Sequence, residues 1–172
     1  MKTDEKSLII KAQSGDREAL GQLWDIVTPK LFGYLINTLK NKPLAEDILQ
    51  TTWLKAINAL PNFQVRSVGI SPWLFAIAKN ECKQHWRKAM PNIELDTETA
   101  DTTSVKNQTA ENNLLIEQIL NKLSEEDQEL LRLRYIADLS PNAIAKILNL
   151  NFVAVRVRLH RAIKRTQIIA NQ

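Results

Sequence analysis

Cysteine, glycine and histidine are scarce in this chain of 172 residues, which contains one, four and two of them. The single cysteine, Cys82, excludes an internal disulfide framework and fits a reducing compartment. Few glycines and little alternating β-branched sequence argue against a sheet and favour an all-helical protein. No apolar run approaches the ~20 residues that span a bilayer, and the N-terminus has no signal-peptide core. We therefore expect a cytoplasmic protein with no direct membrane insertion.

Catalytic motifs are also missing. His85 and His160 are far apart, and the chain has no glycine-rich phosphate loop, metal-ligand cluster or nucleophile motif. Glu46 and Asp47 are adjacent, but neighbouring residues of a helix point to different sides and do not act as a carboxylate pair. We therefore expect neither an enzyme nor a bound cofactor or metal.

Helical periodicity predicts an all-α fold of two small helical domains joined by a flexible acidic linker. The first domain is expected to have helices at residues 7–13, 16–27, 29–39, 43–60 and 73–89. Residues 92–110 are acidic and rich in threonine, so they bury too little apolar surface to offset the entropy of ordering. The expected domains on either side of this linker are residues 1–91 and residues 111–172.

The C-terminal domain has the pattern of a helix-turn-helix. Ser140 is a good N-cap and Pro141 suits the first helical position, so a helix is expected to begin there. A short break at residues 149–151 separates this helix from a second one, which carries cations opposite its apolar side. Two short helices of this kind are the parts of a DNA-reading motif.

The charge of this last segment favours DNA binding. After Asp138 the chain has six Lys or Arg and no acidic residue, whereas a merely solvated helix face usually mixes both signs. A face of one sign suits phosphates and guanine edges. The alternative is a solvated basic helix on the outside of a helical bundle.

Two further patches lie on helices of the first domain. Asp47, Gln50 and Trp53 follow each other at steps of three, which allows a polar and aromatic face for a partner helix. The alternative is a capping carboxylate, a solvated glutamine and a core tryptophan. By spacing alone this alternative is the stronger reading.

The expected helix at residues 73–89 is basic and aromatic. Lys79, Lys83 and Arg87 step by four along one face with Asn80 beside them, and tryptophan and phenylalanine side chains are interleaved. Cations that follow phosphates, aromatics that stack and amides that read unpaired bases together bind single-stranded nucleic acid. Solvated lysines around core aromatics are an equally good reading.

Taken in order, several short runs resemble a sigma factor of the extracytoplasmic-function type, the small two-domain class that directs bacterial RNA polymerase to promoters. The runs that carry the resemblance are Ser14–Leu20, Ala45–Gln50, Pro72–Asn80, Leu123–Ser124, Ala143–Ala145 and Val155–Ala162. Each run is weak alone, but their order and spacing, with an acidic linker between them, are specific.

The resemblance implies a role for each patch. The implied partners are core RNA polymerase, promoter DNA and an anti-sigma factor. Contact with the polymerase is implied through its clamp and flap regions. The residues matched to polymerase binding are Asp47, Gln50 and Trp53. The loop at residues 62–71 and the helix after it are matched to the −10 element, with Phe63, Arg66, Lys79, Asn80, Lys83 and Arg87 as the contacts. The residues matched to the −35 element are Arg156, Val157, Arg158, His160 and Arg161.

The chain also departs from the family pattern. The family usually has glutamate at Ala143, a Gly-Thr pair at Val153 and Ala154, and serine at Val157. These differences put the −35 sequence in doubt but leave the basic face in place.

Two alternatives need no polymerase. One is a free-standing transcription regulator with a terminal helix-turn-helix and a helical partner-binding domain. The other is a structural adaptor built of helical bundles, which predicts no affinity for DNA.

Overall fold

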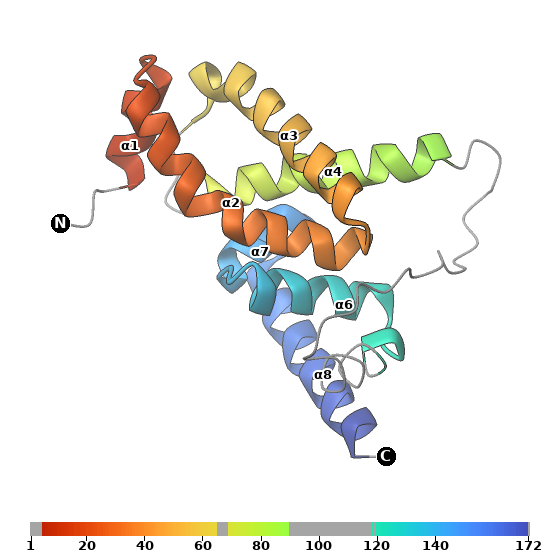
Figure 1. The fold of residues 1–172 in the computed structure, drawn as a ribbon. Helices are drawn as coiled ribbons and strands as arrows, with labels where there is room; N and C mark the ends of the chain where they lie inside the picture. Colours follow the sequence, from red (N-terminus) through yellow and green to blue (C-terminus); the bar gives the residue numbers. More distant parts are fainter. Residues whose placement is uncertain (1–4, 65–68, 90–117, 119, 172) are drawn as a thin grey trace. The chain divides into compact units, whose positions relative to one another are not determined.

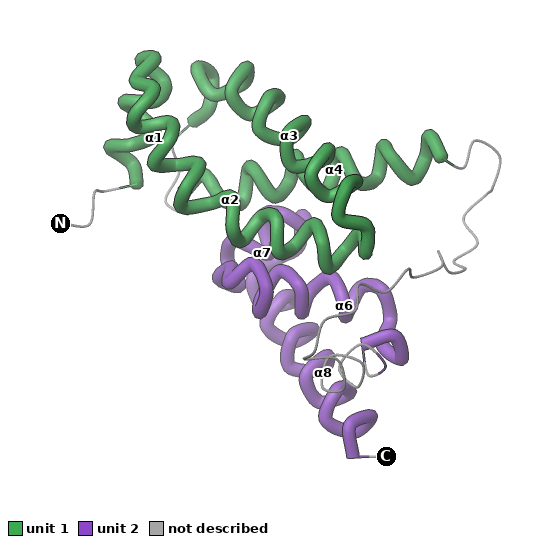
Figure 2. Tube along the Cα trace, viewed as in Figure 1, with its two compact units in different colours: residues 1–102 green, residues 103–172 purple. Residues whose placement is uncertain are grey.

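The computed structural model describes residues 5–64, 69–89, 118 and 120–171. It divides the chain into two compact units, Met1–Thr102 and Thr103–Gln172 (Figure 2). Every regular element in the described residues is a helix or a helical turn, so the predicted all-α class in two regions is confirmed. The predicted linker at residues 92–110 and the predicted contact Arg66 lie outside the described residues.

The described part of unit 1 consists of four helices and a short 3₁₀ turn (Figure 1). These elements are α1 (Glu5–Gln13), α2 (Arg17–Leu39), α3 (Lys42–Ala59), η1 (Leu60–Asn62) and α4 (Ser71–Ala89). The Asp16 carboxylate caps α2 by accepting from the N–H groups of Glu18 and Ala19, and the Asn41 side chain caps α3 by accepting from Leu44 N–H. The sequence therefore encodes these helix starts locally.

The prediction that Pro29 separates two helices is wrong, because α2 continues through it. A proline inside a helix leaves the carbonyl four residues earlier, here that of Asp25, without its N–H partner. Asp25 and Pro29 are both exposed, so water can reach this carbonyl. Val27 and Leu31, on either side of the proline, are buried in the unit's core. Tertiary packing therefore outweighs the local signal of the proline.

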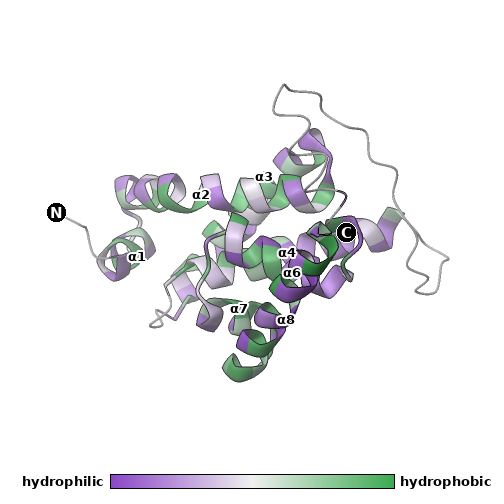
Figure 3. Ribbon diagram, turned by 90° about the horizontal axis from the view of Figure 1, so that it is seen from below, coloured by the Kyte–Doolittle hydropathy of each residue, from purple (hydrophilic) through white to green (hydrophobic). Residues whose placement is uncertain are grey.

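The core of unit 1 is formed by one apolar stripe from each helix, and hydrophobic and hydrophilic residues alternate along the ribbons in Figure 3. Its largest fully buried side chains are Tyr34, Phe75, Ile9, Leu23, Leu31, Leu35, Ile70 and Leu74. The rings of Tyr34 and Phe75 meet edge to face with centroids 5.4 Å apart. Cys82 is buried in the core of the unit, where it acts as a small apolar residue.

Unit 2 contains the predicted helix-turn-helix. Its elements are α6 (Glu125–Leu131), the π-helical turn η2 (Arg132–Ile136), α7 (Pro141–Leu148) and α8 (Phe152–Ala170). The Ser140 hydroxyl accepts from Ala143 N–H at 3.2 Å, which confirms the predicted cap before Pro141. Asn149 then ends α7 in the left-handed conformation, and the Asn151 side chain starts α8 by accepting from Ala154 N–H.

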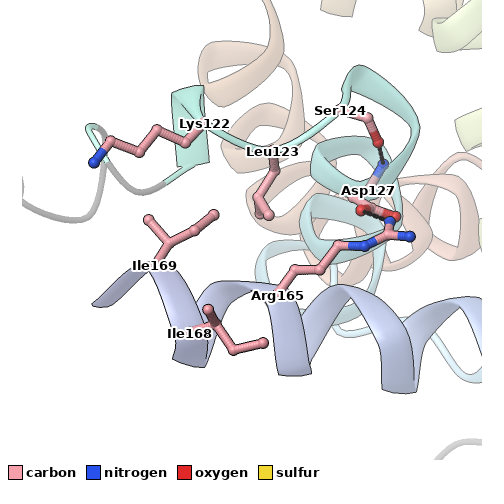
Figure 4. A pocket seen from close by; sticks show the side chains of 7 residues that line it. All are labelled: Lys122, Leu123, Ser124, Asp127, Arg165, Ile168 and Ile169. Carbon is pink, nitrogen blue, oxygen red and sulfur yellow. Dashed lines mark hydrogen bonds and ion pairs between the residues drawn. The ribbon is translucent and has the colours of Figure 1, made fainter. Parts of the chain in front are cut away.

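An ion pair ties α8 to the start of α6. The Arg165 guanidinium donates to the carboxylate of Asp127, whose side chain is only 8% exposed. Figure 4 shows this pair at the wall of a cavity of about 320 Å³ between the two helices. The cavity is lined by Lys122, Leu123, Ser124, Asp127, Arg165, Ile168 and Ile169. In the described part of the chain, no helix is long and apolar enough to cross a bilayer.

Arg165→Gln should lower the free energy of unfolding of unit 2 by about 1–3 kcal/mol, because it leaves the buried Asp127 carboxylate without its charged partner. Lys164→Gln is the matched control, since Lys164 is exposed and its replacement removes the same positive charge. All four tryptophans lie in unit 1, so their fluorescence reports that unit, whereas far-UV circular dichroism reports both. For Arg165→Gln we expect the unfolding curve measured by circular dichroism to shift to lower denaturant, while the fluorescence curve stays in place. For Lys164→Gln we expect neither curve to shift. Equal dichroism curves for the two variants would contradict a stabilising ion pair.

Candidate functional site

The first candidate surface is the outward face of α3. Asp47 and Gln50 are exposed there, as the sequence predicts. Leu54 is 64% exposed and lies seven residues after Asp47, which is within about 20° of two full helical turns. Ile57 is also exposed. The structure therefore adds an apolar part, Leu54 and Ile57, to the predicted polar face.

Trp53 does not belong to that exposed face. Three residues turn a helix by about 300°, so the step from Asp47 through Gln50 to Trp53 moves steadily towards the core. Trp53 is only 2% exposed, and its indole N–H donates to the Thr28 hydroxyl at 3.1 Å. Its ring stacks on Trp24, with centroids 4.8 Å apart, and Trp24 is the exposed member of the pair. The core-tryptophan reading that the spacing favours is therefore confirmed, and the placement of Trp53 on an exposed partner face is wrong.

The second candidate surface runs along α4. Steps of seven, three and four residues place four side chains on one face of this helix, namely Trp73, Asn80, Lys83 and Arg87. Asn80, Lys83 and Arg87 are exposed, and Lys79 beside them is half-buried. At the N-terminal end of this face, Trp73 stacks on Phe63 with centroids 4.6 Å apart. The structure thus joins an aromatic pair, an amide and two cations on one surface.

An ion pair between α3 and α4 holds this surface in orientation. The Lys55 ammonium donates to the Glu81 carboxylate at 2.6 Å, and the Glu81 side chain is almost fully buried. Because Glu81 follows Asn80 directly, fixing Glu81 against α3 turns Asn80 towards solvent. No local sequence pattern predicts this pair, since its partners are 26 residues apart.

Helix α1 holds both described ends of the loop between α3 and α4. The Gln13 side-chain amide donates to the carbonyls of Leu60 and Phe63, at 3.0 and 2.6 Å. The Glu5 carboxylate accepts from Ile70 N–H at 2.8 Å, at the point where α4 begins. Sequence reasoning missed both residues, because their partners lie 47 to 65 positions away.

The third candidate surface is the outward side of α8. Val155, Leu159 and Ala162 are buried, whereas Arg156 and His160 are exposed, as predicted from their spacing. Val157 and Arg161 are exposed on the same outward side. The Arg156 guanidinium lies over the Phe152 ring, 5.7 Å from its centroid.

Arg158 differs from the other cations of α8. Its guanidinium lies 3.4 Å from a Glu126 carboxylate oxygen on α6, and both side chains are exposed. An exposed ion pair of this kind is weak and breaks easily. Ala143, one of the departures from the family pattern, is buried and packs in the core of unit 2. No three His, Cys, Asp or Glu side chains gather as metal ligands within the described ranges.

Comparison with known proteins identifies the two units. The family model of sigma-70 region 2 matches residues 23–91, and that of sigma-70 region 4 matches residues 113–166. The chain is 29% identical over 171 residues to the ECF RNA polymerase sigma factor SigW of Bacillus subtilis, covering 91% of each chain. It is 25% identical over 164 residues to the ECF RNA polymerase sigma factor BldN of Streptomyces coelicolor. That match covers 91% of this chain and 62% of BldN.

Solved structures agree on the fold. CnrH, in its complex with the cytosolic domain of CnrY, superposes with a TM-score of 0.75 at 23% identity over 97% of each chain. The sigma factor RpoE from Bartonella quintana, in complex with the anti-sigma factor NepR, gives 0.66 at 24% identity, covering 88% of this chain and 96% of RpoE. With both family regions in order on one chain, the protein belongs to the sigma-70 family, among its extracytoplasmic-function sigma factors.

Gly69→Ala should destabilise unit 1 by about 1–3 kcal/mol. Gly69 has a φ of +74°, and a Cβ there would overlap the Glu5 carboxylate and push it away from Ile70 N–H. Gly21→Ala is the matched control, because Gly21 lies inside α2 with open space around it. Alanine at that position should stabilise the unit by about 0.5–1 kcal/mol. Tryptophan fluorescence during chemical unfolding measures the free energy of unfolding of both variants. If the two substitutions changed this free energy in the same direction, the proposed contact would be contradicted.

Proposed function

We propose that this sigma factor binds core RNA polymerase in the cytoplasm and directs promoter-specific initiation by recognising −10 and −35 elements. The observation that carries the proposal is the presence on one chain of regions 2 and 4, each with an outward face suited to a different partner. On this proposal the protein acts by binding and positioning, without chemistry of its own.

The α3 face is proposed to dock on the clamp of the polymerase. Asp47 and Gln50 supply exposed polar groups, and Leu54 supplies an exposed apolar side chain in line with Asp47. An apolar anchor surrounded by polar groups is the usual composition of a protein interface. Trp53 is proposed to support this face from beneath, through its stacking on Trp24.

The α4 face is proposed to hold the melted −10 strand. Phe63 and Trp73 present an aromatic pair at the N-terminal end of this face, and Asn80, Lys83 and Arg87 follow along it with an amide and positive charge. Rings stack on unpaired bases, an amide reads their edges, and cations follow the phosphates. Arg66 and Lys79 remain proposed contacts of the same strand.

Unit 2 is proposed to read the −35 duplex and to contact the polymerase flap. Arg156, His160 and Arg161 are exposed on α8, and Val157 lies among them. Arg158 would reach DNA only by leaving Glu126. Their ion pair is exposed and therefore weak. Regulation is proposed to come from an anti-sigma factor, since RpoE of the solved complex binds one.

Run-off transcription with core polymerase on genomic promoter fragments tests the function, and the Asp47→Ala, Gln50→Ala double variant tests its docking face. We expect specific transcripts from the wild type and core binding weakened by about 1–3 kcal/mol in the variant, because both groups lie on the proposed interface. The double variant Glu18→Ala, Gln22→Ala is the matched control, because it removes an acid and a nearby glutamine from α2 instead of from the proposed interface.

Binding of duplex promoter DNA without core polymerase, and no transcripts with it, would favour the free-standing regulator. Normal core binding by the folded double variant would reject the docking face alone.

Asn80→Ala should reduce promoter opening more than core binding, because the amide contacts only bases that have left the duplex. Permanganate footprinting of the holoenzyme at matched promoter occupancy measures the open region. Asn171→Ala, an exposed asparagine of unit 2, serves as the control. An unchanged bubble with Asn80→Ala would remove this residue from the −10 contacts.

A further inference from the structure

Two valines occupy the most outward position at the start of α8. Val153 and Val157 each lie two residues from the buried Val155, which is about 200° around the helix. They therefore point almost directly away from the core, and they are 67% and 42% exposed. They are four residues apart, so their side chains form one continuous apolar patch.

The fold gives no reason for valine at these positions. Branching at Cβ restricts the side chain in a helix, so alanine or a long polar residue forms this helix better. Apolar side chains turned to water contribute no burial to the fold, and a partner that covers them gains that burial on binding. The patch therefore points to a partner rather than to the core of unit 2.

The surroundings of the patch indicate a nucleic acid. Arg156 flanks the valines on one side and Arg161 on the other, and α8 carries no acidic residue. Asn151 caps the helix directly before Phe152, so both valines lie in its first two turns. In a helix-turn-helix those turns contact base edges in the major groove.

Only one base offers an apolar group in that groove. Guanine, adenine and cytosine present hydrogen-bond donors or acceptors there, and thymine adds its C5-methyl group. A valine can neither donate nor accept a hydrogen bond, and it would strip water from a polar edge without replacing it. The methyl group of thymine is therefore the partner that fits.

We propose that Val153 and Val157 read thymine methyl groups in the −35 element, so that this protein requires thymine at the positions that the two valines contact. The proposal rests on the −35 function proposed above. Arg156 and Arg161 hold the flanking phosphates or guanines, and the two valines select the bases between them.

Replacing thymine by deoxyuridine tests this directly, because it removes the methyl group and leaves every hydrogen bond intact. Wild-type holoenzyme first selects its −35 sequence from a random library, and each selected thymine is then replaced singly. We expect binding to weaken about fourfold at one or more positions, the effect of one buried methyl group. Val157→Ala or Val153→Ala should abolish this weakening at one position each, whereas Val157→Ile should retain it.

Ile168→Ala is the control, an exposed apolar residue about 16 Å further along α8 than Val157, which should leave the methyl dependence unchanged. A selected motif without thymine, or equal binding of thymine and deoxyuridine by the wild type, would overturn the proposal. Equal binding would assign the valines to a protein partner instead. Failure to select any sequence would overturn the −35 function itself, so the two failures are distinguishable.

Discussion

The burial of one apolar stripe on each helix is the constraint on which the rest of this structure depends. A small helical unit has few side chains to bury, so its helices must turn their apolar sides inward together. Once Val155 and Leu159 are buried in unit 2, the direction of every other side chain of α8 follows from the helical period. The surfaces offered to partners are therefore fixed by the core.

Ion pairs and hydrogen bonds between distant residues refine this arrangement at the functional surfaces. Lys55 with Glu81 fixes the rotation of α4, and Arg165 with Asp127 ties α8 to α6. Glu5 and Gln13 on α1 hold the ends of the loop that leads into α4. Each pair includes a buried or half-buried group, for which the loss of its partner is costly.

The proposed division between polymerase, single-stranded DNA and duplex DNA rests on the chemistry of the three faces. The face of α3 combines acid, amide and apolar groups, which suits another protein. The face of α4 adds aromatic rings to cations, which suits unpaired bases. The face of α8 has cations around two valines, which suits the major groove of a duplex. One family fold thus presents three kinds of surface.

The sequence by itself determined the all-helical class, the cap at Ser140 and the basic side of α8, because these depend on neighbouring residues and on the helical period. Only the tertiary structure decided that α2 continues through Pro29 and that Leu54 turns outward beside the polar face of α3. Those outcomes depend on packing between helices, whose free energy exceeds the local preference of any one residue. The contacts of Glu5 likewise needed the fold, because a hydrogen bond to a backbone group 65 residues away leaves no local pattern.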